Sequence, residues 1–237
     1  MSSLYQDDLA YVQAVGFSEM AARAATDVIR RLRAAGARHV VEVGCGAGPL
    51  TAALTSEGFD VTAIEQSAAL LDYARANAPE GRFIHASVYD VELPPCDAVI
   101  GVGEVFNYHR YPEEGRERVF HYFEQVRRVL PQGGLLIFDV IETGRETLTA
   151  NGHIEGDGWS VVVETIERDG ELDRLISTSR RVGDKWRRSE ERHRVYLFDR
   201  NDVIEELQKL GFAVETAAFY GTLPMLRRRR AFFCEVM

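Results

Sequence analysis

The chain has 237 residues, of which 46% are hydrophobic, enough to bury the core of one domain with a small addition. Its net charge of -9 disfavours a dedicated nucleic-acid binder, so we expect no DNA partner. The three cysteines lack C-x-x-C spacing, which disfavours a disulfide framework and a zinc site; we expect no metal and a reducing compartment. No apolar run approaches the ~20 residues that span a bilayer, and residues 1–16 do not resemble a signal peptide. We therefore expect a cytoplasmic protein without a membrane partner.

The first section of the chain is predicted to be helical. Apolar residues recur at helical spacing between Phe17 and Ala35, and Gly36 follows them, where a helix commonly ends. A β-branched run at residues 39–43 then predicts a strand. We therefore treat residues 1–38 as an N-terminal helical segment.

A ladder of three glycines follows the predicted strand. Gly44, Gly46 and Gly48 stand at alternate positions, and Glu42 precedes them. Glycine adopts backbone angles closed to other residues and lets a ligand approach the main chain, as at the nucleotide sites of open α/β sheets. A dinucleotide-binding fingerprint would place its third glycine at position 49, where the chain has Pro49. This difference disfavours a nicotinamide-dependent oxidoreductase.

Three further strands are expected to end at the same edge of the sheet as the glycine ladder. Residues 59–65 form an apolar run that ends in Glu65, 21 positions after Gly44. An acid about 20 residues after the glycines commonly accepts hydrogen bonds from ribose hydroxyls. The other two predicted strands run over residues 82–86 and 97–102. They end before Ser87 and Gly103, so these residues should converge on one crevice.

The glycine ladder and its neighbours resemble motif I of the class I (Rossmann-like) S-adenosylmethionine (SAM) dependent methyltransferases, which reads E-x-G-x-G-x-G. A predicted helix at residues 113–130, a Pro-Gln-Gly-Gly turn and a predicted strand at residues 135–141 continue the resemblance. Residues 39–141 are therefore expected to form a SAM-binding core. The small-molecule type of this family is the nearest resemblance.

The chain changes its pattern after residue 141. Residues 142–199 contain three strand-like runs, which predict an inserted antiparallel meander over residues 159–167, 172–182 and 185–198. This insertion resembles that of bacterial small-molecule methyltransferases, including sugar N,N-dimethyltransferases. Residues 200–237 predict a final helix and a hairpin that completes the core sheet. The predicted fold class is α/β, with a seven-stranded, mostly parallel methyltransferase sheet flanked by helices and an inserted antiparallel β meander.

The resemblance implies SAM as the cofactor and S-adenosylhomocysteine (SAH) as the product. It implies that the glycine ladder passes beneath the methionine part, that Glu65 binds the ribose, and that Gln66, Ser87 and Val88 flank the adenine, with Asp90 as an alternative to Ser87. An N-terminal lid could cover the cofactor, although its aromatic residues could equally pack against the first helix. The implied cofactor-binding residues are Gly44, Cys45, Gly46, Gly48, Glu65, Gln66, Ser67, Ser87, Val88, Gly103 and Glu104, with Tyr5, Tyr11 and Phe17 of the lid.

Methyl transfer from a sulfonium is an in-line displacement, so alignment can supply much of the catalysis and a base is needed only if the acceptor must lose a proton. The polar candidates for catalysis are Glu104, Tyr108 and His109, although His109 could equally be a surface histidine and Tyr108 a packing residue. We expect transfer to an O or N atom of a small molecule. An RNA or protein methyltransferase and a non-catalytic SAM/SAH-binding protein are the alternatives. The N/D-P-P-Y/F element of amino-directed nucleic-acid enzymes is absent after Val102.

Arginine is concentrated in two places. The run Arg227, Arg228, Arg229 and Arg230 could be a solvated loop or could recognise an anionic acceptor, since arginine forks pair with carboxylate or phosphate. In the predicted meander, arginines alternate with Glu190 and Glu191, which suggests surface ion pairs that could form a dimer face. The chain is expected to be a monomer or a homodimer.

Overall fold

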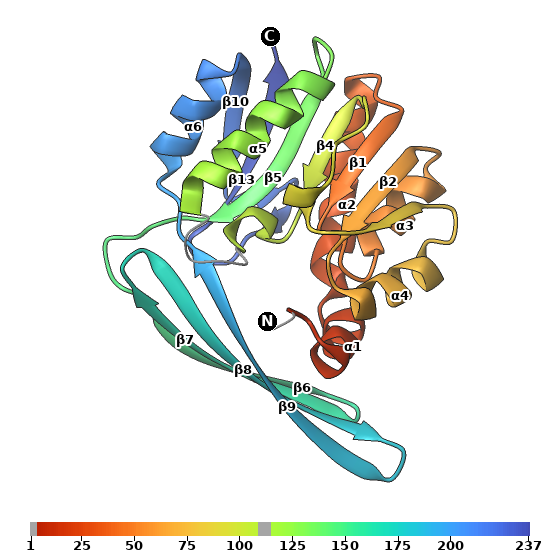
Figure 1. Ribbon diagram of the computed structural model, residues 1–237, viewed down its shortest axis with the longest axis vertical. Coiled ribbons are helices and arrows are strands. Elements are labelled where there is room, and N and C mark those ends of the chain that lie inside the picture. The colour runs from red at the N-terminus through yellow and green to blue at the C-terminus, as the bar shows by residue number, and fades with distance from the viewer. Residues whose placement is uncertain (1–3, 109–114) are drawn as a thin grey trace.

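The structure is a computed structural model that describes residues 4–108 and 115–237 (Figure 1). Its core is a seven-stranded sheet in which only β13 runs against the other strands. In spatial order, the strands of this sheet are β10 (Phe212–Ala217), β13 (Arg229–Val236), β5 (Leu135–Ile141), β4 (Ala98–Gly101), β1 (His39–Val43), β2 (Asp60–Glu65) and β3 (Arg82–His85). The predicted fold class is confirmed.

Six helices and two short 3-10 turns accompany the sheet in the described part of the chain. They are α1 (Asp7–Gly16), α2 (Ser18–Ala34), α3 (Pro49–Ser56), α4 (Ala68–Asn77), η1 (Val88–Asp90), η2 (Val105–Asn107), α5 (Gly115–Val129) and α6 (Arg200–Lys209). Helices α2 and α3 pack on one face of the sheet, and α5 and α6 pack on the other. The central strands are therefore buried on both faces, which is why β4 is apolar throughout and β1 is apolar apart from His39 and Glu42.

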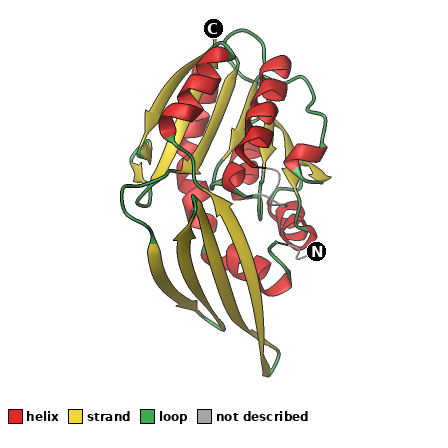
Figure 2. Cartoon of the chain, turned by 60° about the vertical axis from the view of Figure 1, so that its left-hand side comes forward, coloured by secondary structure: helices red, strands yellow, loops and turns green. Residues whose placement is uncertain are grey.

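The insertion is a separate antiparallel sheet that projects from one end of the core (Figure 2). Its strands are β6 (Thr149–Gly156), β7 (Trp159–Arg168), β8 (Glu171–Val182) and β9 (Lys185–Tyr196). The turn between β7 and β8 is built on Asp169 and Gly170, both with positive φ, as a tight hairpin requires. The prediction of three strands was wrong because it omitted β6. This strand is an exposed edge strand that contains Asn151 and glycines. Such a strand is held by pairing with β7, and its sequence carries no buried face to recognise.

The region after α6 also differs from the prediction in one detail. The first strand of the final hairpin was expected over residues 212–220, but it ends at Ala217. Phe219 and Tyr220 form a separate short strand, β11 (Phe219–Tyr220). This strand pairs with β12 (Leu223–Pro224) beside the main sheet. Tyr220 is thereby buried next to β5, where its hydroxyl donates to Asp139 at 3.0 Å.

Helix α1 lies between the core sheet and the insertion. Leu9 and Val12 pack against Trp159, Val161 and Ile176 of the insertion. The opposite side of the same helix contacts the core through a second apolar cluster, formed by Ala10, Ala47 and Leu70. The helix thus joins the two sheets at the carboxyl ends of the parallel strands. Among the helices described, none is both long enough and apolar enough to cross a lipid bilayer.

Candidate active site

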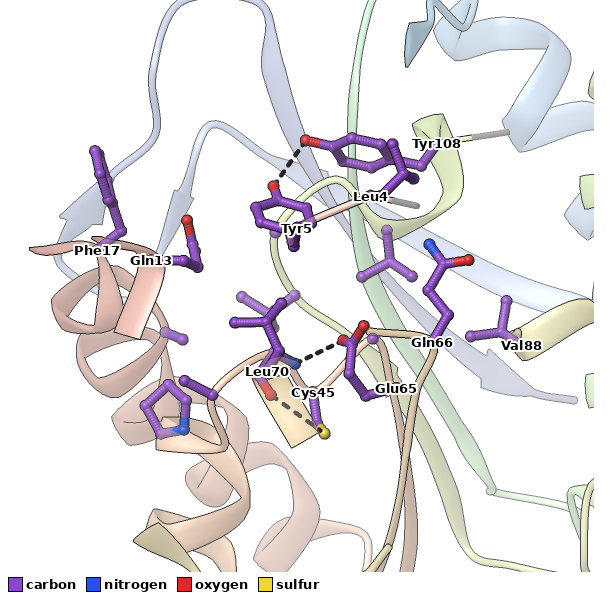
Figure 3. Close-up of a pocket in the computed structure, with 18 of the residues that line it drawn as sticks. Leu4, Tyr5, Gln13, Phe17, Cys45, Glu65, Gln66, Leu70, Val88 and Tyr108 are labelled. Atoms are coloured by element: carbon purple, nitrogen blue, oxygen red, sulfur yellow. Dashed lines mark hydrogen bonds between the residues drawn. The ribbon is translucent and has the colours of Figure 1, made fainter. Parts of the chain in front are cut away.

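A pocket opens where strands β1, β2 and β4 end, with an empty volume of about 1060 Å³ that includes space open to solvent (Figure 3). Glu65 and Cys45 lie on one side of it, and Tyr5 and Tyr108 lie on the other. Of the predicted site residues, those that line the pocket are Tyr5, Phe17, Gly44, Cys45, Gly46, Glu65, Gln66, Ser87, Val88, Gly103 and Tyr108. Segments far apart in the chain are therefore brought to one cavity, as the positions of the strand ends predicted.

The glycine ladder forms the turn from β1 into α3. A Cβ atom on Gly46 would meet no neighbouring atom within 4 Å, so the main chain at this residue faces open space with φ +58°. Gly48 has a different task. A Cβ there would lie 2.9 Å from Cα of Ala74, so glycine at this position allows α3 and α4 to pack closely.

Four of the predicted cofactor residues do not line the pocket. Gly48 is one of them, and Tyr11 is another, because its ring lies beneath the Arg180 guanidinium, 3.7 Å away. Ser67 caps α4 and accepts from the Leu70 N–H at 3.1 Å. Glu104 is buried behind the pocket wall in an ion-pair cluster. His109, which was a candidate for catalysis, lies outside the described residues.

Glu65 stabilises the glycine turn from the end of β2. Its Oε2 accepts the Gly46 N–H at 3.0 Å, and its Oε1 accepts the Ser67 N–H at 2.8 Å. Burial raises the pKa of Glu65, although these backbone donors oppose the rise. A carboxylate has about four lone-pair directions, so each oxygen keeps one for a ligand hydroxyl.

Glu104 lies at the centre of a buried charge cluster that connects the core, the insertion and the last strand. Its carboxylate is 2.5 Å from Nη1 of Arg174 and 2.6 Å from Nη2 of Arg229, and it accepts from the Tyr108 hydroxyl at 3.2 Å. Burial alone would raise the pKa of Glu104, but Arg229 and Arg174 outweigh it and lower the pKa to about 2. A carboxylate with so low a pKa stays ionised near neutral pH.

The turn that carries Glu104 is held by Asp139 at the middle of β5. Its two oxygens accept the N–H groups of Gly103 and Glu104, each at 2.8 Å. Glu104 adopts a left-handed conformation, with φ +59°, that is unfavourable for a side chain with a Cβ. The two hydrogen bonds that Asp139 accepts maintain that conformation.

Several lining residues were not predicted. Tyr89 and Val105 are adjacent to predicted positions. Asp90, the alternative to Ser87, does not line the pocket and pairs with Arg118 at 2.9 Å. Helices α1 and α2 contribute Gln13 and other residues, and no sequence motif marks them. The lining residues missed from the sequence are Leu4, Gln13, Ser18, Ala21, Ala47, Pro49, Leu70, Tyr89, Val102 and Val105.

The four consecutive arginines form neither a free cationic patch nor a solvated loop. Each of the four side chains has a carboxylate partner. The side chains of Arg228, Arg229 and Arg230 are themselves mostly buried. The pairs and their N–O distances are Arg227–Glu146 at 3.6 Å, Arg228–Glu167 at 2.6 Å, Arg229–Glu104 at 2.6 Å and Arg230–Glu142 at 3.3 Å. The run fastens the start of β13 to β5, η2 and the insertion.

Glu42, the acid of the glycine motif, faces Thr51 of α3 and not the pocket. The Thr51 hydroxyl donates to its Oε2 at 2.5 Å. Burial raises the pKa of Glu42 to about 8. Because this folded-state pKa lies above the ordinary value of 4.5, the associated stability is complete below about pH 4.5 and is lost as the pH rises toward 8.

We therefore expect Glu42→Gln to be more stable than the wild type at pH 8, with the difference vanishing near pH 4.5. The wild type should lose up to about 1.4 kcal/mol of unfolding free energy per pH unit from this group across that interval. Urea unfolding at several pH values measures the slope. Glu57→Gln, at an exposed position, is the control and should keep the wild-type slope; an unchanged slope in Glu42→Gln would show that Glu42 is ionised in the folded state.

Comparisons with known proteins agree with this geometry. A family model described as a methyltransferase domain matches residues 40–134, which include the glycine ladder and Glu65. A protein of Geobacillus sp. (strain WCH70) that is named as a methyltransferase is 28% identical over 212 residues, and the match covers 84% of each chain.

Solved structures share the fold over almost the whole chain. A SAM-dependent methyltransferase from Clostridium acetobutylicum superposes with a TM-score of 0.80 at 16% identity, covering 95% of this chain and 96% of that one. The sugar N-methyltransferase KedS8 from Streptoalloteichus sp. superposes with a TM-score of 0.76 at 21% identity, covering 100% of this chain and 94% of that one. The matched domain and the shared fold confirm the resemblance read from the glycine motif: residues 40–134 are similar to a methyltransferase domain, and the whole chain shares the fold of solved SAM-dependent methyltransferases.

Proposed function

We propose that this chain transfers the methyl group of SAM to an amine nitrogen of a small molecule. The observation that carries the choice of nitrogen is the chemistry of the described lining residues. Glu65 is the one carboxylate among them, and its oxygens already accept two backbone N–H groups. The other titratable side chains there are a cysteine and tyrosines, and burial raises the pKa of Tyr5 to about 12 and that of Cys45 well above its usual value.

A pocket lined in this way suits an acceptor that brings its own lone pair. A neutral amine can attack the sulfonium methyl directly, whereas an alcohol oxygen is a good nucleophile only when a base removes its proton. The pocket can hold the amine in line with the methyl group, and such alignment can supply a large part of the rate enhancement. The likeness in fold to KedS8, a sugar N-methyltransferase, supports the same class of acceptor.

We propose one orientation of the cofactor among the described lining residues. Glu65 would accept the ribose hydroxyls with its remaining lone pairs, and Gln66 and Val88 would contact the adenine at one end of the pocket (Figure 3). The open backbone at Gly46 would let the methionine part approach the main chain. When bound, SAM supplies the electrophilic methyl group, and the protein supplies position and exclusion of water.

An acceptor panel tests this proposal. Amino sugars would each be paired with the sugar that carries a hydroxyl in place of the amine, and SAH formation would be measured together with the mass of the product. We expect methylated amines and unchanged alcohols. Methylation of the alcohols, with the amines left unchanged, would contradict the assignment to nitrogen.

A further inference from the structure

The structure assigns a positioning role to Glu191: we infer that this side chain of the insertion holds the N-terminal lid closed over the cofactor site. The inference rests on the proposed function, since the lid covers the pocket in which SAM is proposed to bind. The lid is defined here as residues 4–6 together with helix α1. Leu4 and Tyr5 of the lid line the pocket directly.

Glu191 binds the lid through its main chain. Its Oε2 accepts the Tyr5 N–H and its Oε1 accepts the Gln6 N–H, both at 2.8 Å. Gln6 is the N-cap residue of α1 and provides no side-chain cap of its own. Glu191 therefore supplies, from a strand nearly two hundred residues later, the carboxylate that a helix N-terminus favours.

The Glu191 carboxylate is itself held in place. It is only 4% exposed, and Nε2 of the fully buried His193 lies 2.9 Å from its Oε2. The His193 ring also packs against Tyr5 and Tyr108, with ring centroids 5.1 and 5.7 Å apart. Alternation along β9 explains the placement, because Glu191 and His193 face the core whereas Glu190 faces outward. The expectation that Glu191 belongs to a surface ion pair was therefore wrong.

The other contacts of the lid lead to the pocket. The Tyr5 carbonyl accepts from the Ser67 hydroxyl at 2.7 Å, and the Ser67 N–H donates to Glu65. The Tyr5 hydroxyl lies 3.0 Å from that of Tyr108, so its ring closes over the cavity (Figure 3). Tyr5 has φ +52°, which is unfavourable for a residue with a Cβ. Hydrogen bonds to both the N–H and the carbonyl of Tyr5 hold this conformation: Glu191 accepts from the N–H, and Ser67 donates to the carbonyl.

A second link connects α1 to the insertion independently of Glu191. Asp8 is buried and accepts from Nε of Arg187 at 2.7 Å, and Nη1 of Arg180 lies 3.8 Å from it. This link anchors the body of the helix to β8 and β9. Loss of Glu191 should therefore free residues 4–6 without releasing the whole helix, and the cofactor site would spend more time open.

The test compares Glu191→Ala and Glu191→Gln with the outward-facing neighbour Glu190→Gln as the matched control. Amide hydrogen exchange is followed over the peptide containing residues 4–10 in the protein without ligand, and calorimetry gives the Kd for SAH. We expect faster exchange of that peptide in Glu191→Ala, and a Kd raised by roughly tenfold to a hundredfold, as for the loss of charge-assisted hydrogen bonds. Glu191→Gln should lie between, because its amide oxygen can accept one of the two N–H groups. Glu190→Gln should match the wild type.

The outcomes distinguish the inferred role of Glu191 from the proposed function. If Glu191→Ala lowers the unfolding temperature but leaves both the exchange of residues 4–10 and the Kd for SAH unchanged, Glu191 is a stabilising residue only and the inference is overturned. If the wild type itself does not bind SAH, the proposed function fails, while the exchange measurement still decides whether Glu191 holds the lid.

Discussion

Arg229→Ala is expected to lower the unfolding free energy by about 3–5 kcal/mol at pH 7, the range for removing one partner from a buried ion pair. Glu104 is buried, and its carboxylate lies 2.6 Å from Nη2 of Arg229. Removal of this guanidinium would leave Arg174 as the one arginine bound to Glu104 in the described structure. Urea unfolding followed by circular dichroism measures the loss. In this variant the pKa of Glu104 should rise, because one of the two arginines that lower it is gone.

The matched control for this variant is Arg227→Ala. Arg227 belongs to the same run of arginines, but its side chain is 80% exposed and its nearest carboxylate, that of Glu146, lies 3.6 Å away. Exposed pairs of this kind contribute little, so the change should stay within about 0.5 kcal/mol. Equal losses of unfolding free energy in Arg229→Ala and Arg227→Ala would contradict the claim that burial makes the Arg229–Glu104 pair important for stability.

Acid should remove the same stabilisation in the wild type. The folded-state pKa of Glu104 is about 2, below the ordinary value of 4.5, so its contribution is complete above about pH 4.5 and is lost as the pH falls toward 2. That contribution is on the order of 3 kcal/mol. The acid dependence and the Arg229→Ala variant therefore test the same ion-pair cluster by two measurements.

Glu65→Ala is expected to weaken SAM binding by about 1–3 kcal/mol, the range for hydrogen bonds to a charged group. The structure adds a second reason for the loss, because Glu65 also accepts the backbone N–H groups of Gly46 and Ser67. Its removal would loosen the glycine turn as well as the ribose contact. Calorimetric titration with SAM measures the effect, with the exposed Glu57→Ala as the control. Unchanged affinity in Glu65→Ala would refute the role proposed for this residue.

The part of the site that sequence could predict depends on local pattern. Gly44, Gly46 and Glu65 follow strands whose apolar runs are visible in the sequence, and parallel strands bring their carboxyl ends together. The same reasoning placed Ser87 and Gly103 at the pocket. For these residues the position along a strand determines the position in space.

The remaining part depends on pairings between distant residues. Glu104 was predicted to contact SAM or the acceptor, but it meets Arg174 and Arg229, which lie on the insertion and on the last strand. Glu191 meets Tyr5 across 186 positions of the chain. No local pattern indicates which carboxylate an arginine will find, or which backbone N–H group a buried glutamate will cap. The edge strand β6 was missed for a related reason, since its partner and not its own side chains determines its structure.

The most direct measurement of the central claim is calorimetric titration of the wild-type protein with SAM, SAH and NAD in parallel. The geometry of the glycine turn and of Glu65 predicts binding of SAM and SAH with micromolar affinity and no heat with NAD. Binding of NAD without binding of SAM or SAH would contradict the assignment of this pocket to a methyl donor.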